Sequence, residues 1–153
     1  MKKKSIVPLS RFSEPDQSPG FLLWKVSNAW QRKLRTALQP LELTHSQFVI
    51  LATATWFEQE GPLTQARLSE LAGIDPMTTS QIVRTLISAQ LIHREKHPGD
   101  PRANWITVTA SGRDKAKHAV GVVEQADSQF FEPISDRMKQ LTELFLALGH
   151  NGS

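Results

Sequence analysis

The strongest constraint on the fold is a pair of helix starts in PLTQARLSELAGIDPMTTSQIVRTLISAQ, residues 62–90. Thr64 is a favourable N-cap for a first, short helix. Gly73 suits the left-handed residue that ends this helix and lets the chain reverse. Asp75 followed by Pro76 then begins a second helix. Two helices joined by a turn of about three residues have the spacing of a helix-turn-helix.

The second helix, predicted over 76–89, has two unlike faces at about 100° per residue. One face can pack against the preceding helices and comprises Thr79, Ile82, Val83, Leu86 and Ala89. The other is polar and centres on Met77, Gln81, Arg84 and Ser88, flanked by Thr78, Ser80 and Thr85. It carries no acid, so its hydroxyl, amide and guanidinium groups can bond base edges and phosphates without repelling DNA. The alternative is an exposed polar face without a ligand.

A β-hairpin is predicted directly after this helix, because two strand-like runs flank the loop PGDPRA (98–103). The prolines and the glycine hold this loop away from the body of the domain. Arg102 then lies at its edge, where it can reach a narrow, electronegative minor groove. Asp100 would repel phosphate if it were free, so we expect it to hold Arg102 or Arg94 by a charge-assisted hydrogen bond.

Helical periodicity continues on both sides of this segment. A helix is expected from Pro19 to Pro40, and Thr44 and Thr109 are expected to cap later helices. The long helix after Thr109 is expected to end at Pro133, with an apolar helix following it. These last helices have little core left to cover, so their burial against a second copy of the chain is the natural outcome.

Composition limits the function classes. The 153 residues suffice for one domain with a core, and the absence of cysteine excludes disulfides, thiolate metal sites and thiol redox sensing. No apolar run approaches a membrane span, and the N-terminal residues do not resemble a signal peptide, so a cytosolic protein is expected.

Positive charge is concentrated in residues 1–35 (+6) and 62–118 (+3), whereas residues 36–61 and 119–153 each carry a net charge of −3. This distribution favours nucleic-acid binding without deciding it.

The order of these elements resembles the MarR-type winged-helix transcription regulators over about residues 20–149. The resemblance rests on LTHSQFVIL (43–51), on the helix-turn-helix stretch, and above all on DPRANWITVTASG (100–112). The last resembles the wing signature of that family, an Asp-x-Arg-Ala loop that leads into a strand, a threonine cap and a glycine. Together, in this order and spacing, the motifs are specific.

The resemblance implies a triangular homodimer that places two recognition helices (76–89) in successive major grooves. The wings (91–109) would reach the flanking minor grooves, with Arg102 as the wing arginine and Asp100 as the acid that supports it. Gln90 stands where members commonly have glycine. A left-handed residue there would cost glutamine about 1 kcal/mol more than glycine, unless the turn takes another conformation.

The fold class is therefore expected to be mainly α with a small β-hairpin wing. Residues 1–18 are expected to form a flexible basic arm, and 19–153 a single MarR-like domain. Within this domain, 40–109 would be the winged helix-turn-helix lobe, and 19–39 and 110–153 the dimerisation helices.

Two further patterns in the sequence have more than one interpretation. His93 and His97 have metal-ligand spacing on a helix, but on a strand they lie about 13 Å apart, so no metal site and no cofactor are predicted. Trp24, Trp30 and Trp56 suit core and dimer packing, or else the walls of a pocket for a small aromatic effector. Common nucleotide-binding, metalloprotease and serine-hydrolase motifs are missing, so an enzyme is not expected.

The sequence predicts a cytosolic, homodimeric regulator that binds a pseudo-palindromic double-stranded operator, represses, and is released by a small molecule. Met77, Thr78, Gln81 and Arg84 are the candidates for base contacts. Ser80, Thr85 and Ser88 are the candidates for phosphate contacts, and Arg102 for the minor groove. The alternative from another class is a dimeric winged-helix module that binds an acidic protein partner.

Overall fold

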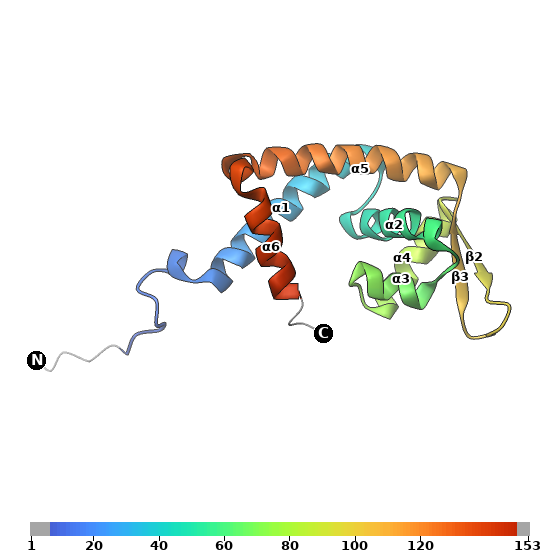
Figure 1. The fold of residues 1–153 in the computed structure, drawn as a ribbon, viewed down its shortest axis with the longest axis horizontal. Coiled ribbons are helices and arrows are strands. Elements are labelled where there is room, and N and C mark those ends of the chain that lie inside the picture. Colours follow the sequence, from blue (N-terminus) through green and yellow to red (C-terminus); the bar gives the residue numbers. More distant parts are fainter. Residues whose placement is uncertain (1–6, 150–153) are drawn as a thin grey trace, which may run out of the picture.

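The computed structural model describes residues 7–149 and has the mainly helical fold with a β-hairpin that the sequence predicts (Figure 1). The elements follow in the order α1 (Pro19–Leu38), α2 (His45–Phe57), β1 (Leu63–Thr64), α3 (Gln65–Ala72), α4 (Pro76–Ser88), β2 (Ile92–Lys96), β3 (Asn104–Val108), α5 (Ala110–Phe130) and α6 (Met138–Gly149). Short 3-10 turns cover Pro15–Gln17, Gln39–Leu41, Glu58–Glu60 and Glu132–Arg137.

The predicted caps of the helix-turn-helix are confirmed. The Thr64 hydroxyl accepts a hydrogen bond from the Arg67 N–H at 3.1 Å, and the Asp75 carboxylate accepts one from the Thr78 N–H at 2.9 Å. Gly73 ends α3 with φ +66°, the left-handed conformation that glycine adopts readily. These local interactions fix where α3 ends and α4 begins.

The sheet has one strand more than the predicted hairpin. β2 and β3 pair antiparallel, and β1 pairs with the other edge of β3, which gives the order β1-β3-β2. In the added pairing Leu63 lies opposite Ile106, and both side chains are buried. β1 therefore anchors the hairpin to the segment that begins α3.

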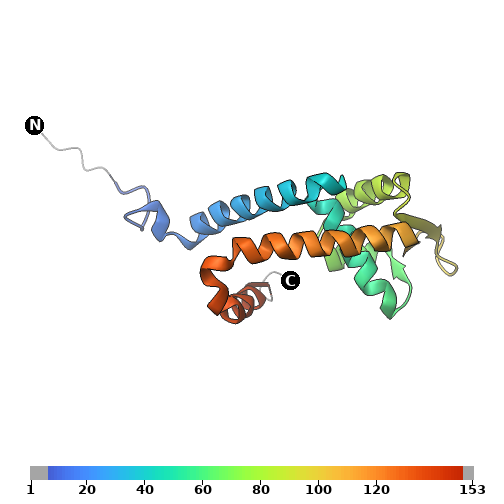
Figure 2. The same ribbon diagram turned by 90° about the horizontal axis from the view of Figure 1, so that it is seen from above.

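A single core joins the lobe to the neighbouring parts of α1 and α5. Leu34 and Leu38 of α1 and Ala116 and Ala119 of α5 belong to the same buried cluster as the residues of α2, α4 and the sheet. Figures 1 and 2 show α1 and α5 running beside each other, with α6 turning back from the end of α5. One face of the C-terminal half of α1 thus packs with the lobe.

Glu58 ties the end of α2 to the base of the hairpin. One of its carboxylate oxygens accepts a hydrogen bond from the Val108 N–H at 3.1 Å, and the other accepts one from Arg113 Nε at 2.8 Å. The Glu58 side chain is only 19% exposed. Because β3 and α5 meet at this carboxylate, the hairpin has a defined direction relative to α2.

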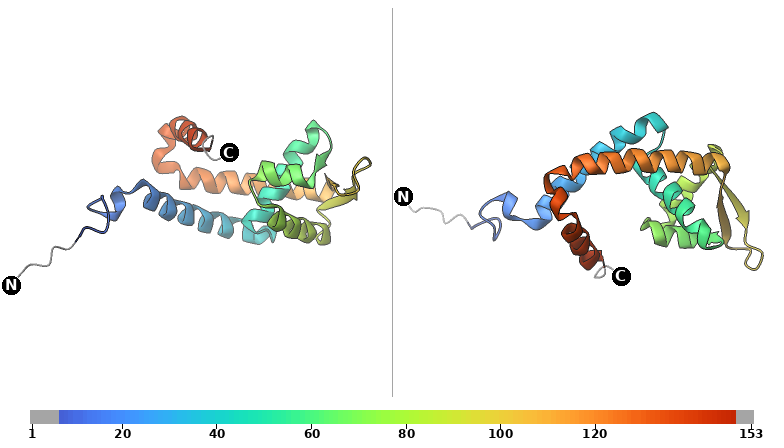
Figure 3. Two further views of the ribbon diagram at one scale, coloured as in Figure 1. Left: turned by 90° about the horizontal axis from the view of Figure 1, so that it is seen from below. Right: turned by 45° about the horizontal axis from the view of Figure 1, so that its top comes forward.

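The first half of α1 and the whole of α6 carry exposed apolar side chains. The set comprises Phe21, Leu22, Leu23, Trp24 and Val26 on α1, and Leu144, Phe145, Leu146 and Leu148 on α6. Figure 3 shows that both segments lie at the end of the molecule opposite the sheet.

Among the helices of residues 7–149, none is both long and apolar enough to cross a membrane.

The first six residues of the arm predicted over 1–18 lie outside the described residues. In the remainder, Gln17 Oε1 accepts hydrogen bonds from the Ser13 N–H and hydroxyl at 3.2 and 3.0 Å. Asp16 forms an ion pair with Lys25 at 3.1 Å. This segment extends away from the rest of the chain in Figures 1 to 3.

Candidate nucleic-acid interface

The two faces of α4 are placed as the sequence predicts, with one exception. The inward face is buried at Thr79, Ile82, Val83 and Leu86. On the outward face Met77 is 74% exposed, and Gln81, Arg84, Thr85 and Ser88 are also exposed, whereas Thr78 and Ser80 are half-buried. The sequence predicts Ala89 on the inward face, but α4 ends at Ser88 and Ala89 is exposed. The acid-free surface is thus open to a ligand.

Two hydroxyl groups of this surface already donate hydrogen bonds within the helix. Thr85 Oγ1 donates to the Gln81 carbonyl at 3.2 Å, and Ser88 Oγ donates to the Arg84 carbonyl at 3.1 Å. Such bonds to the preceding turn compete with outside partners. These hydroxyls must therefore rotate before they can donate to a phosphate, whereas no such bond within the helix holds the Gln81 amide or the Arg84 guanidinium among the described residues.

The start of α4 is fixed by a charged cap. Hydrogen bonds from the Thr78 hydroxyl and the Thr78 N–H lower the pKa of Asp75 from its ordinary value. The carboxylate is therefore negative at neutral pH, which suits the positive end of the helix dipole. This cap sets the first turn of α4, which presents Met77.

In the hairpin loop, Asp100 holds the main chain of Arg102 and not a guanidinium. Asp100 Oδ1 accepts a hydrogen bond from the Arg102 N–H at 2.9 Å. No ion pair joins Asp100 to Arg102 or Arg94 within the part of the chain that the structure describes, so the expected side-chain contact is replaced by a main-chain contact. The Arg102 and Arg94 side chains are both exposed, with Arg94 opposite Ile106 on β3.

The hairpin tip and the first turn of α4 border the same hollow. This hollow of about 250 Å³ is lined by Pro76 at the start of α4, Gln65 at the start of α3, and Arg102 in the loop. Gln65 Oε1 is buried beside it, without a hydrogen-bond partner among residues 7–149. The start of α4 and Arg102 therefore lie next to each other on one side of the lobe.

His97 organises the loop, a role that sequence reasoning missed. Its Nδ1 accepts hydrogen bonds from the Gly99 N–H at 2.9 Å and the Asp100 N–H at 3.1 Å. Its ring stacks on Trp105 of β3, with centroids 4.7 Å apart and planes 5° from parallel. The sequence offered only a histidine placed before Pro98 and Gly99, a pattern with no specific meaning taken alone.

In the turn between α4 and β2, Gln90 adopts the left-handed conformation that the sequence analysis considered. Gln90 has φ +60°, and the Leu91 N–H donates to the Leu86 carbonyl at 3.0 Å in the pattern of a helix C-cap. The Gln90 carbonyl accepts a hydrogen bond from Thr109 Oγ1 at 2.8 Å. Glutamine is therefore accommodated in the left-handed conformation, with Thr109 holding the turn.

The three tryptophans lie in different surroundings. Trp24 and Trp56 are 68% and 73% exposed, on α1 and α2 respectively. Trp30 is half-buried, and its Nε1 donates to Asp127 Oδ1 at 2.7 Å while its ring meets His45 edge-on at 5.0 Å. Trp30 therefore serves packing between α1, α2 and α5 within one chain.

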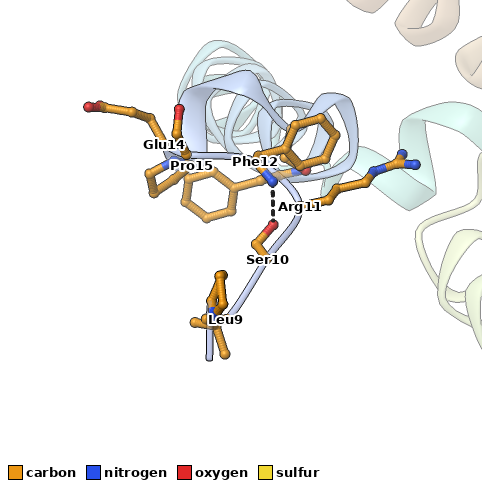
Figure 4. Close-up of a pocket in the computed structure, with 10 residues that line it drawn as sticks. Leu9, Ser10, Arg11, Phe12, Glu14 and Pro15 are labelled. Carbon is orange, nitrogen blue, oxygen red and sulfur yellow. Dashed lines mark hydrogen bonds between the residues drawn. The ribbon is translucent and has the colours of Figure 1, made fainter. Parts of the chain in front are cut away.

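Two other hollows are lined by none of these tryptophans. One of about 440 Å³ lies where α1 leads into α2 and includes Arg35, Glu42 and His45. Figure 4 shows the other, of about 700 Å³, whose ten lining residues all come from Pro8 to Phe21. Because that hollow is enclosed only by the N-terminal segment and the start of α1, it has no connection with the surface of α4.

His45 gives folding a pH dependence. Burial lowers the pKa of His45 from its ordinary value of 6.5, and attraction to Asp127 opposes part of this change. As pH falls through 6.5, the unfolded chain takes up a proton on this imidazole before the folded chain does, so the free energy of unfolding decreases. In urea unfolding at pH 8 and pH 5, His45→Gln is expected to show a smaller decrease than the wild type. Equal decreases would contradict this assignment.

Comparison with known proteins agrees with this geometry. Residues 43–104 match the profile of the family described as MarR. The chain is 37% identical over 142 residues to the uncharacterised HTH-type transcriptional regulator YdcH of Bacillus subtilis, covering 92% of this chain and 97% of that one. It is 33% identical to the HTH-type transcriptional repressor Rv2887 of Mycobacterium tuberculosis, covering 74% of this chain and 81% of the repressor.

Solved structures also superpose on this chain over most of its length. A MarR-family transcriptional regulator from Rhodococcus sp. RHA1 superposes with a TM-score of 0.77 at 26% identity, covering 88% of this chain and 94% of that one. The complex of Rv2887 with salicylic acid superposes with a TM-score of 0.62 at 30% identity, covering 88% and 96%. The similarity therefore extends over the lobe and over the helices that flank it.

Proposed function

The chain belongs to the MarR family of transcription regulators, and from this premise we propose that it binds operator DNA through α4 and the hairpin. The observation that carries the proposal is the exposed, acid-free face of α4, a helix whose first residue, Pro76, borders the same hollow as Arg102. In a helix-turn-helix, the N-terminal residues of the second helix contact base edges in the major groove. A loop beside that helix then meets the adjacent minor groove.

The residues of this surface have distinct roles in the proposal. Gln81 and Arg84 read bases, since an amide recognises adenine and a guanidinium recognises guanine in the major groove. Met77 and Thr78, in the first turn, contact the same groove. Ser80, Thr85 and Ser88 lie towards phosphates, and Arg102 enters the minor groove, where A·T-rich sequence makes the potential most negative.

A second copy of the chain completes the binding unit in this proposal. The exposed apolar faces of α1 and α6 are those that a symmetric dimer would bury. Residues 19–39 and 110–153 then form the dimer base, and 40–109 forms each DNA-binding lobe. Two lobes related by a twofold axis require a pseudo-palindromic operator.

A small aromatic acid is the proposed effector, because a 30%-identical relative was crystallised with salicylic acid. Trp24 and Trp56, exposed in the single chain, are candidates to line an effector pocket once a second copy is added, and the half-buried Trp30 is the third candidate. We further propose that the protein represses, acts in the cytoplasm where its DNA is found, needs no cofactor, and catalyses no reaction.

The test is selection of preferred duplexes from a random pool by the purified protein, repeated with salicylate. We expect one pseudo-palindromic sequence that competes at least about a thousand-fold better than random duplex. Salicylate is expected to weaken binding to it. Equal competition by random duplex would reject the DNA-reading function and favour the alternative, a dimeric module that binds an acidic protein.

Gln81→Ala tests base reading on the selected operator. Loss of the amide is expected to relax base preference at one position in each half-site by about 1–3 kcal/mol, and to leave other positions unchanged. The measurement is the binding profile over all single-base variants of the operator. Gln59→Ala is the matched control, because Gln59 is exposed in the 3-10 turn that follows α2 and is not part of α4. An unaltered Gln81→Ala profile would remove this residue from base readout.

A further inference from the structure

The hairpin loop is a closed hydrogen-bonded unit, and His97 is at its centre. The His97 N–H donates to the Ala103 carbonyl at 3.0 Å, and the Ala103 N–H donates to the Asp100 carbonyl at 3.1 Å. His97 Nδ1 accepts the N–H groups of Gly99 and Asp100 at 2.9 and 3.1 Å. The Asp100 carboxylate in turn accepts the Arg102 N–H. A continuous path of contacts thus leads from the imidazole to the wing arginine.

We infer that His97 is a positioning residue whose neutral imidazole shapes this loop and so places Arg102 for the minor groove. The inference rests on the proposed function, because it concerns how the wing meets DNA. It adds a residue that touches no base and acts through the main chain of Gly99, Asp100 and Arg102.

The geometry requires the neutral ring. A neutral imidazole has one acceptor nitrogen, whereas both nitrogens of an imidazolium are donors. In the loop, Nδ1 faces two N–H donors at once. Protonation at Nδ1 therefore replaces two hydrogen bonds by two donor–donor contacts, and the loop must open. Stacking on Trp105 holds the ring plane in place but supplies no acceptor.

The charged and titratable groups around the ring lie on β2 and in the loop. The register puts His93 and Glu95 on the same face of the hairpin as His97, with Glu95 opposite Trp105 and His93 opposite Thr107. From β3 the ring meets Trp105, and β1 behind it contributes only the uncharged Leu63 and Thr64.

Asp100 and Arg102 are the charged groups of the loop itself, and Lys96 precedes the ring on the other face of the hairpin. Glu95 and Asp100 would attract an imidazolium, whereas Arg102 and Lys96 would repel it. The two main-chain donors are nevertheless the groups that Nδ1 contacts directly.

This arrangement reverses the usual effect of acid on DNA binding. Protonated histidines add positive charge, which ordinarily strengthens the attraction to phosphate. Here the protonated ring would release the loop that carries Arg102. Imidazoles change charge between pH 5 and pH 8, so the predicted weakening falls within an accessible range.

Two variants of His97 distinguish the effect of the Nδ1 acceptor from the effect of the aromatic ring. His97→Asn keeps an acceptor that can bond the main chain two residues on, as in an Asx turn, and does not titrate. His97→Phe keeps an aromatic ring over Trp105 but has no acceptor. His93→Asn is the matched control, since it removes an imidazole from the same face of the same hairpin without touching the loop.

The experiment measures affinity for the selected operator at pH 8.0 and pH 5.5, together with ¹⁵N relaxation of residues 98–103 in the free protein. On acidification the wild type and His93→Asn should each lose about tenfold in affinity, which corresponds to about 1.4 kcal/mol. His97→Asn should bind like the wild type at pH 8.0 without this loss, and His97→Phe should bind about tenfold more weakly at both pH values.

Relaxation should show the loop becoming mobile at pH 5.5 in the wild type, and mobile at both pH values in His97→Phe. Wild-type behaviour of His97→Phe, or an unchanged pH response in His97→Asn, would overturn the inference while leaving operator binding intact. If no duplex is preferred, the proposed function fails, and the relaxation data alone decide whether His97 shapes the loop.

Discussion

Replacing Gly112 by alanine is expected to lower the free energy of unfolding by about 3 kcal/mol, the upper part of the range for an overpacked core. A Cβ atom on Gly112 would lie 1.9 Å from the Leu91 carbonyl oxygen and 2.8 Å from Val108 Cγ1. Neither neighbour can yield easily. The Leu91 oxygen also accepts hydrogen bonds from the Thr109 N–H at 3.0 Å and from Thr109 Oγ1 at 3.1 Å, so moving it breaks the start of α5.

The measurement is urea unfolding followed by circular dichroism at one fixed protomer concentration. Gly121→Ala is the matched control, because it makes the same change in the same helix with nothing within 4 Å of the new methyl group. There alanine should stabilise by up to about 1 kcal/mol through its higher helix propensity. If Gly112→Ala were as stable as Gly121→Ala, the close approach of Leu91 would not restrict this position.

The same contact explains the glycine of the DPRANWITVTASG motif. The sequence identified that glycine by resemblance, and the structure supplies its cause, a close approach between the end of the recognition segment and α5. The threonine cap, Thr109, was predictable from local sequence, because an N-cap depends on residues three positions apart. The approach of Leu91 to Gly112 was not, because it joins residues 21 positions apart through the hairpin.

In the rest of the fold and in the site, too, local features were predictable from the sequence and long-range contacts were not. The starts of α3 and α4 and the two faces of α4 follow from caps and period, which are local properties. β1 was missed because two residues carry no period, and it pairs with a strand some 40 positions later. The interactions of Asp100 and His97 with loop N–H groups were missed because a loop's hydrogen bonds depend on its path, which its residue types do not specify.

Arg102→Ala is expected to weaken binding to the selected operator by about 100-fold or more. Removing a hydrogen bond to a charged group costs about 1.5–3 kcal/mol, and a dimer loses two, one at each wing. The Arg102 side chain is exposed and only its N–H holds the loop, through Asp100, so the fold and the dimer should be unaffected. Fluorescence anisotropy with the operator, and sedimentation of the free protein, measure the two effects.

Flanking sequence distinguishes minor-groove reading from simple attraction. If Arg102 enters a narrow groove, the loss should be largest with A·T-rich flanks, whose minor groove is most negative, and smaller with G·C-rich flanks. Lys96→Ala removes the same charge from an exposed position of the same hairpin, and should weaken binding equally for both flanks. A loss of equal size for Arg102→Ala on both flanks would reduce Arg102 to a phosphate contact. No loss at all would remove the wing from recognition and leave α4 as the sole reading element.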